Sequence, residues 1–241
     1  IEIERSNRFV ERRIPIPDGT DSSRISTAVV LNTDGSLRPV PTRLEEKDGQ
    51  TIAIISSLTN STYAIVGFSA KFDDIAHHWA ADAIRDLASR LIVRGGTSSD
   101  FNPNGSITRA EFIAIVVRAL GLPENGETSR YADVRAGDWF RGAVSAAQEY
   151  GLIQGASDGR FLPLNTISRQ EAMVILSRAM ELAGMNTDIL AEETEAVLSK
   201  YADYGKIGAW AKQAAAASVQ NQLITGTEAG IMPLRDLTRA E

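Results

Sequence analysis

The sequence contains no cysteine, so disulfides, thiolate metal ligands and thiol nucleophiles are all excluded. Its two histidines, His77 and His78, are adjacent, and such a pair offers no usable base for a serine nucleophile. No run of 18 apolar residues occurs, so the sequence predicts no membrane-spanning helix. These absences leave paired carboxylates for glycoside hydrolysis open, although no particular pair stands out. We expect no metal ion or other cofactor.

Positively charged residues are outnumbered by negatively charged ones. The 241 residues include 25 Lys and Arg against 31 Asp and Glu, which gives a net charge of −6. Nucleic acids and anionic membranes attract basic surfaces, so neither is an expected partner, and a bound anion must be held by a local site. The chain opens with IEIERSNRFVERR, which has neither a starting Met nor an apolar signal segment. We expect it to be a piece of a longer protein, in which a secretion signal can lie upstream.

Residues 1 to about 70 have the pattern of β-structure. The segment 26–46 contains two extended stretches separated by Asp34-Gly35, a dipeptide typical of tight hairpin turns. The segment 48–70 alternates in the same manner. We expect four to six short strands in this region.

From about residue 71 the apolar spacing becomes that of helices. The segment 78–93 places five apolar residues on one helical face, namely Trp79, Ala83, Ile84, Leu87 and Leu91. The segment 111–122 does likewise with Phe112, Ile115, Val116 and Leu120. It ends at Gly121-Leu122-Pro123, and glycine followed closely by proline is a helix stop signal.

This helix–loop–helix pattern occurs three times. The phrase ITRAE at 107–111 returns as ISRQE at 167–171 and as LTRAE at 237–241. Before the arginine of each phrase stand a tryptophan (by 30, 30 and 29 positions), a glycine (by 14, 14 and 13) and a proline (by 6 each time). The arginines are Arg109, Arg169 and Arg239, the tryptophans Trp79, Trp139 and Trp210, and the glycines Gly95, Gly155 and Gly226. Such an ordered coincidence indicates tandem repeats.

The repeats resemble S-layer homology domains, the modules that hold surface proteins on bacterial cell walls. The resemblance covers about 71–241. It rests on the Asp-x-x-x-x-His-Trp opening, on the TRAE phrase, and on the loops Phe101-Asn102-Pro103, Phe161-Leu162-Pro163 and Ile231-Met232-Pro233. It implies repeats arranged with pseudo-threefold symmetry, whose grooves bind a secondary cell-wall polysaccharide that often bears a pyruvate ketal. The expected fold class is therefore α+β, with a small N-terminal β domain followed by an all-α pseudo-threefold assembly.

The expected domains follow the repeats. They are a β-rich region at 1–70, repeat 1 at 71–123, repeat 2 at 124–187, and an acidic helical insert plus truncated repeat 3 at 188–241. The insert, within 186–200, is predicted to form an extra helix that either packs across a groove or extends away from it. Repeat 3 stops at Glu241 before its second helix, either because the fragment was cut there or because the chain continues. If that helix is absent, we expect Arg239 to lie on a frayed helix end with a poorly formed groove.

The five-residue phrase has a structural interpretation and a functional one. Each copy has a Ser or Thr three residues before a Glu, which is the capping box that opens a helix: Thr108 with Glu111, Ser168 with Glu171, and Thr238 with Glu241. Capping does not explain the arginine, because a cation at the first helical position opposes the helix dipole. Free N–H groups at a helix start bind anions, and a guanidinium matches a carboxylate. The hypothesis is a carboxylate receptor, for the pyruvate ketal that the resemblance implies; the alternative is an ion pair with an Asp of the adjacent repeat.

The other repeated residues keep two interpretations each. The tryptophans belong to the core, or offer a flat apolar face to a sugar ring, or do both with one face packed and the other exposed. An aspartate precedes each of them (Asp74, Asp133 and Asp203), and it either caps the helix or accepts hydrogen bonds from sugar hydroxyls. The three glycines fit left-handed helix C-caps, and the lack of a side chain would also let a ligand approach the backbone.

Metal binding is not expected. His77-His78 with Asp73-Asp74 has no counterpart in the other repeats. The SDGRF loop near Asp158 lacks the alternating acidic ligands of a calcium loop.

We therefore expect a non-catalytic module on the extracellular bacterial surface that anchors a larger protein. Its expected partner is an anionic cell-wall polysaccharide, with self-association as a further possibility. Two alternatives stay open. The chain belongs either to a structural S-layer lattice protein or to the accessory region of a carbohydrate-active enzyme whose active site lies upstream.

Overall fold

A computed structural model describes residues 5–32, 35–124, 129–155, 158–227 and 229–241. Its contacts divide the chain into two compact units. The first comprises the described residues of Ile1–Gly105, Ile115–Glu124 and Arg239–Glu241. The second comprises those of Ser106–Ala114 and Asn125–Thr238.

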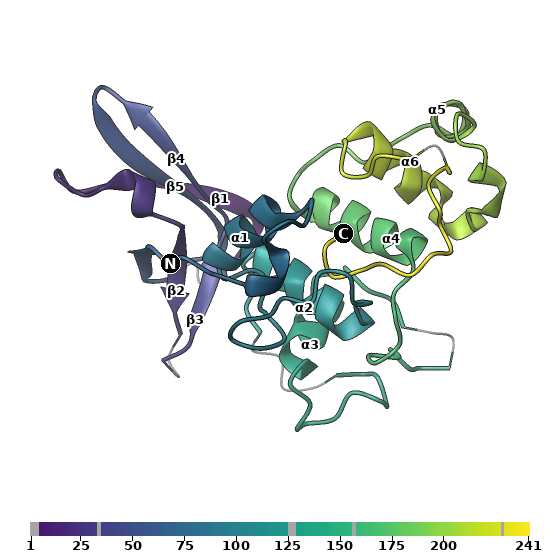
Figure 1. The fold of residues 1–241 in the computed structure, drawn as a ribbon, viewed down its shortest axis with the longest axis horizontal. Helices are drawn as coiled ribbons and strands as arrows, with labels where there is room; N and C mark the ends of the chain where they lie inside the picture. Colours follow the sequence, from purple (N-terminus) through teal and green to yellow (C-terminus); the bar gives the residue numbers. More distant parts are fainter. Residues whose placement is uncertain (1–4, 33–34, 125–128, 156–157, 228) are drawn as a thin grey trace. The chain divides into compact units, whose positions relative to one another are not determined.

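Six strands form the β region of the first unit (Figure 1). They are β1 (Arg5–Pro15), β2 (Thr27–Leu31), β3 (Leu37–Val40), β4 (Thr42–Lys47), β5 (Gln50–Thr59) and β6 (Tyr63–Val66). Two three-stranded sheets have the orders β1-β5-β4 and β3-β2-β6, with antiparallel pairing throughout. The predicted strands are confirmed.

The predicted hairpin is also confirmed. β2 pairs with β3 in the register Ala28↔Val40 to Leu31↔Leu37. Gly35 has a φ of 82°, in the left-handed region that such a turn favours. The other predicted turn residue, Asp34, lies outside the described residues.

The β region packs on repeat 1 within the first unit. The Arg38 guanidinium donates to the carbonyl of Gly121, and Nη1 of Arg90 donates to the Thr42 carbonyl at 3.1 Å. Gly121 has a φ of 61°, and a side chain there would meet the Pro39 carbonyl at 3.0 Å. Glycine at this position thus ends a helix, as the sequence predicts, and also lets β3 approach.

The helices follow the strands along the chain, which confirms the α+β class (Figure 1). Repeat 1 contributes α1 (Ala81–Ser89) and α2 (Arg109–Ala119), repeat 2 contributes α3 (Arg141–Glu149) and α4 (Arg169–Leu182), and repeat 3 contributes α6 (Lys212–Gln220). Short 3₁₀ turns are η1 (Ser22–Arg24), η2 (Asp73–Ile75), η3 (Tyr204–Lys206) and η4 (Ala209–Ala211). The pseudo-threefold arrangement and the four domain boundaries stay predictions.

The acidic insert forms α5 (Ala191–Leu198), as predicted. In the second unit α5 and α4 both contact α6. Ile189 and Leu198 of the insert share a buried cluster with Ala215, Ala216 and Ala217 of α6. The alanine-rich helix is therefore closely packed, because residues with small side chains let the neighbouring backbones approach.

The first helix of each repeat ends in a left-handed residue. These residues are Leu91, Gly151 and Gln222, with φ of 63°, 73° and 58°. The next N–H donates back into the helix in each case: Ile92 to Leu87, Leu152 to Ala147, and Leu223 to Ser218. This pattern is a Schellman-type ending.

Candidate functional site

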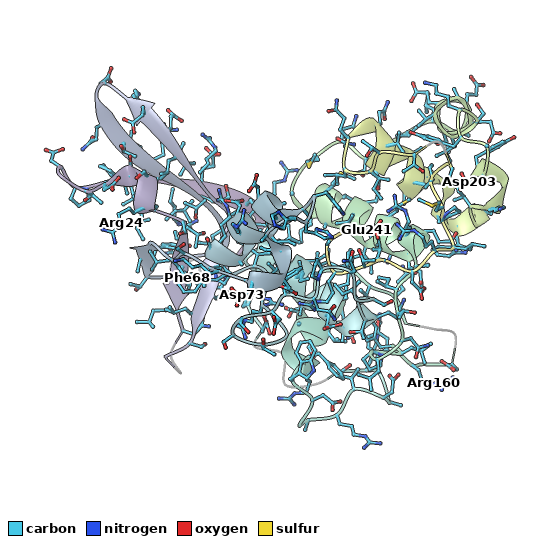
Figure 2. The ribbon with its side chains drawn as sticks, viewed as in Figure 1. Arg24, Phe68, Asp73, Arg160, Asp203 and Glu241 are labelled. Atoms are coloured by element: carbon cyan, nitrogen blue, oxygen red, sulfur yellow. The ribbon has the colours of Figure 1, made fainter. Side chains whose placement is uncertain are left out.

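Each repeat contains an aspartate that holds its loop. The carboxylate accepts hydrogen bonds from two successive backbone N–H groups of the loop that contains the repeated proline. Asp74 accepts from the N–H groups of Phe101 and Asn102 (2.9 and 2.6 Å). Asp133 accepts from those of Phe161 and Leu162 (2.8 and 2.8 Å), and Asp203 accepts from those of Ile231 and Met232 (2.9 and 2.7 Å). Figure 2 labels Asp203 in repeat 3. The prediction that these aspartates cap a helix is wrong: they fasten a loop.

These loops need such fastening. The second amide donor in each pair belongs to a residue with positive φ: Asn102 (59°), Leu162 (59°) and Met232 (54°). A non-glycine residue in this conformation costs about 1–2 kcal/mol. Two charge-assisted hydrogen bonds offset that cost. In repeat 1 the Phe101 N–H, assisted by the Asn102 N–H, holds the pKa of Asp74 below its ordinary value.

The arginine of each phrase contacts the loop of another repeat. Its Nε donates to the carbonyl of the residue whose N–H binds the aspartate. The bonds join Arg109 to Phe161 (3.0 Å), Arg169 to Ile231 (2.8 Å) and Arg239 to Phe101 (2.9 Å). Arg109 and Arg239 also lie over the rings of those phenylalanines, 5.1 and 4.9 Å from the ring centres. The arginines therefore join repeat to repeat.

Arg239 does not lie on a frayed end. Besides its bond to Phe101, its Nη2 donates to the Arg94 carbonyl at 2.7 Å. The N–H groups of Arg239 and Ala240 donate to the carbonyls of Gly105 (2.8 Å) and Pro103 (3.0 Å). The expectation that Arg239 would lie on a frayed helix end is wrong. Its hydrogen bonds are made to repeat 1, and they do not depend on a helix after Glu241.

The start of each second helix is already occupied. The N–H groups of Arg109 and Ala110 donate to the carbonyls of Asn165 (2.9 Å) and Pro163 (3.0 Å). In repeat 2, Arg169 and Gln170 donate in the same way to Arg235 and Pro233. The prediction that free helix N–H groups would bind an anion is therefore wrong for these residues, since the loop of another repeat takes them.

Arg109 also forms an ion pair. Its Nη1 lies 2.6 Å from Oε1 of Glu171, and the two side chains are 14% and 35% exposed. Arg109 thus pairs with a carboxylate of the adjacent repeat, but this carboxylate belongs to a glutamate and not to the aspartate that the alternative named. Nη2 of Arg109 donates to no described residue.

The capping boxes of the first two repeats are confirmed. Glu171 accepts hydrogen bonds from the N–H (2.9 Å) and the hydroxyl (2.6 Å) of Ser168. Glu111 accepts the same two bonds from Thr108 at 2.9 and 2.8 Å. The box of Thr238 and Glu241 stays a prediction.

The repeated glycines are not left-handed caps. Gly95, Gly155 and Gly226 have no positive φ. A side chain at Gly155 would lie 2.2 Å from Cε1 of Tyr131, and one at Gly226 equally close to Cε1 of Tyr201. At Gly95 the corresponding ring is Phe72, at 2.7 Å, and the Thr97 carbonyl is closer still at 2.5 Å. Glycine is needed because an aromatic ring packs directly on the backbone.

The sequence did contain a signal for these rings. Phe72, Tyr131 and Tyr201 each stand two residues before the repeated aspartate. In the first two repeats the ring lies beside the loop phenylalanine, with centres 5.5 Å apart for Phe72 and Phe101 and 5.6 Å apart for Tyr131 and Phe161. An aromatic residue at a fixed distance from the aspartate was the pattern to note.

The three tryptophans are exposed. Their relative exposures are 76% for Trp79, 64% for Trp139 and 61% for Trp210. Trp79 precedes α1, so its prediction as part of a buried helical face is wrong, whereas Ile84 of that face is buried. The core interpretation fails for all three tryptophans. Their role toward a sugar stays a prediction.

Two other kinds of site, a membrane span and a metal cluster, are absent from the described residues. None of their helices is long and apolar enough to cross a membrane. No group of three or more of their His, Asp and Glu side chains is placed to hold a metal ion.

The fold and contacts above define a tandem helix–loop–helix repeat protein with a β region. The family model of the S-layer homology domain matches residues 71–113 and 130–173. The chain therefore carries S-layer homology domains. The third repeat, outside the match, has the same aspartate and arginine contacts.

Similar proteins include both enzymes and surface proteins. The chain is 35% identical over 183 residues to an amylopullulanase of Thermoanaerobacterium thermosulfurigenes (75% of this chain and 10% of that protein). It is 34% identical over 186 residues to the exoglucanase XynX of Acetivibrio thermocellus (76% and 16%). It is 32% identical over 176 residues to the surface-layer 125 kDa protein of Lysinibacillus sphaericus (72% and 14%). The chain thus spans a small part of these relatives, and the location that its domains indicate is the cell surface.

Proposed function

We propose that this chain is a non-catalytic module that anchors a larger protein to the cell surface by binding an anionic cell-wall polysaccharide. The observation that carries the proposal is the exposure of Trp79, Trp139 and Trp210. A large aromatic ring left in water forgoes burial of its apolar area. Three equivalent positions do so, which favours a ligand with flat apolar faces, such as a sugar chain.

The proposed ligand carries a pyruvate ketal. Its carboxylate is the anion that we assign to Nη2 of Arg109, whose N–H groups reach no described residue. Because the helix N–H groups are already bonded, the guanidinium alone would supply the donors. Several such contacts along one polymer would raise the apparent affinity through effective concentration.

Calorimetry of the chain against wall polysaccharide, with its pyruvate intact or removed, tests the proposal. We expect the variant with Trp79→Ala, Trp139→Ala and Trp210→Ala to lose at least about tenfold in affinity, since aromatic contacts contribute about 1 kcal/mol each. The matched control carries Leu31→Ala and Leu37→Ala, two exposed apolar residues of β2 and β3. Equal binding by both variants would overturn the proposal.

Arg109→Gln tests the carboxylate separately. We expect weaker binding of the pyruvylated polymer and no change toward the polymer without pyruvate. Circular dichroism must first show that the variant is folded, because Arg109 also holds Phe161. A loss of affinity that is equal for both polymers would assign Arg109 a structural role alone.

Self-association is the second candidate. Leu164 and Leu234, which follow the loop prolines of repeats 2 and 3, are 73% and 62% exposed. Apolar residues at equivalent positions suit contacts between copies of a surface protein. Sedimentation velocity over a hundredfold range of concentration tests this, and Leu164→Ser with Leu234→Ser should abolish any association that is seen.

A further inference from the structure

A cavity of about 1150 Å³ opens in the first unit. Its walls come from the residues around the end of β1 (14–17), from the η1 loop (20–26), from the end of β6 and the residues after it (65–70), and from the second half of α1. Most of this lining lies before residue 71, outside the matched repeats. Its volume slightly exceeds the roughly 300–1,000 Å³ that is usual for sites of small organic ligands.

One wall of the cavity is formed by Phe68, whose backbone is fixed by hydrogen bonds. The hydroxyl of Ser26 donates to the Phe68 carbonyl at 2.7 Å and accepts from the Phe68 N–H at 2.9 Å. A side chain at Gly67 would lie 2.2 Å from the Arg24 carbonyl, so the η1 loop packs directly on this backbone. Phe68 is nevertheless 52% exposed. The backbone of Phe68 is thus held in place while its ring faces solvent.

The cavity also contains a cation without a hydrogen-bonded partner. The other charged groups of the lining are bonded to neighbours: Arg85 to Asp82 (2.9 Å), Arg90 to Asp86 (2.9 Å), and Asp21 to the hydroxyl of Ser23 (2.6 Å). Among the described residues the Arg24 guanidinium donates no hydrogen bond. Its charge does act on Asp21 of the same lining, whose pKa is lowered first by the Ser23 hydroxyl and N–H and also by Arg24. Arg24 and Phe68 lie in the same part of the first unit (Figure 2). The lining therefore offers a guanidinium and a ring in a single cavity.

A polypeptide strand is a poor occupant. β1 and β6 are both edge strands beside the cavity. The Ile16 N–H already donates to the Thr51 carbonyl at 2.9 Å. Pro15 and Pro17, on either side of it, have no N–H, and prolines at a sheet edge oppose the addition of another strand.

We propose that this cavity binds a sugar unit that bears a carboxylate. The ring of the sugar lies on Phe68, the carboxylate accepts from the fork of Arg24, and the Ser69 hydroxyl, bonded to no described residue, is placed to bond a sugar hydroxyl. The site is separate from the repeat loops. The inference rests on the proposed function for the source of such a sugar, the cell-wall polymer, and makes the β region a second point of attachment.

The test uses the 241-residue chain and two probes, trigalacturonate and its fully methyl-esterified form, which keeps the sugar rings and removes the charge. Calorimetry should show binding of the acid and at least about tenfold weaker binding of the ester, the usual scale for a charge-assisted hydrogen bond. Arg24→Gln and Phe68→Ala should each weaken binding of the acid to a similar extent. Arg135→Gln, which removes an exposed arginine of repeat 2, is the matched control and should bind like the parent.

Two results would overturn the inference: no binding of the acid, or parent-like binding by Arg24→Gln. The variant without the three repeat tryptophans separates this inference from the proposed function. It should retain trigalacturonate binding, and loss of that binding would place the probe at the repeats instead. If the parent chain fails to bind wall polysaccharide but binds trigalacturonate through Arg24, the result contradicts the proposed function and supports the cavity site.

Discussion

Nη1 of Arg109 lies 2.6 Å from Oε1 of Glu171, the acidic residue of the next repeat's phrase. The other carboxylate oxygen of Glu171 accepts from the N–H and the hydroxyl of Ser168, at the start of α4. One carboxylate therefore starts its own helix and joins it to the arginine of the preceding repeat. The repeated five-residue phrase therefore links two repeats as well as capping a helix.

Glu171→Gln should lower the free energy of unfolding by about 1 kcal/mol. The amide retains one oxygen for the cap and loses the ion pair, whose strength is reduced by partial exposure. Urea denaturation measures the change. The control Glu195→Gln removes a pairing with Lys212 that is 3.7 Å long and more exposed, and it should change stability by less than about 0.5 kcal/mol. Equal losses would show that the Arg109 pair adds nothing.

Asp74 should make the stability depend on pH. Its pKa in the folded chain is lowered, first by the Phe101 N–H, so its contribution is complete above the unfolded pKa of about 3.9 and is lost as the pH falls through the lower folded value. The melting temperature of Asp74→Asn should therefore lie below that of the parent by a constant amount between pH 7 and about 5. The gap should then shrink in more acidic solution.

Thermal melts from pH 7 to pH 3 follow this gap. Asp18→Asn, at an exposed position, is the control and should match the parent throughout. A gap for Asp74→Asn that stays constant down to pH 3 would contradict the proposed origin of the effect.

Gly155→Ala should destabilise the chain by about 1–3 kcal/mol, as expected for overpacking. The added carbon would lie 2.2 Å from Cε1 of Tyr131, a residue that is only 3% exposed. Gly137→Ala is the control, since no atom lies within 4 Å of a side chain there and its φ is not positive. Chemical denaturation of both variants compares them, and equal stabilities would show that the Tyr131 ring moves aside without cost.

Gln222→Gly should stabilise the chain by about 1 kcal/mol, because glycine adopts a left-handed φ without strain. Gln222 is exposed and has a φ of 58°. Gly151→Ala, at the equivalent position with a φ of 73°, should have the opposite effect. Differential scanning calorimetry reports both changes, and a loss of stability in Gln222→Gly would contradict the argument.

Local patterns in the sequence predicted most of the elements. The alternation in 48–70 predicted strands, and the acidic segment 186–200 predicted α5, because both signals depend on neighbouring residues. The capping boxes at Thr108 and Ser168 were predicted for the same reason. The left-handed helix ends were predicted at the wrong glycines, since two of the three observed ends use Leu91 and Gln222, which lack the usual glycine signal.

The site was harder to predict because its contacts are long-range. The Thr108-x-x-Glu111 pattern shows a helix start, but nothing local shows that Asn165 and Pro163 accept its N–H groups. Likewise the bond from Arg239 to Phe101 spans 138 positions. The spacing of the repeats identified the repeated residues of the site, whereas only the structure showed which of them contact one another.

The exposure of the tryptophans has a spectroscopic consequence. The chain contains three tryptophans, and all three occupy this one position of the repeat. Its intrinsic fluorescence therefore originates at the surface and should already emit at long wavelength in the folded state. Unfolding should shift that emission little, whereas a molecule that covers the rings should shift it to shorter wavelength, so the unmodified chain contains its own optical reporter of occupancy.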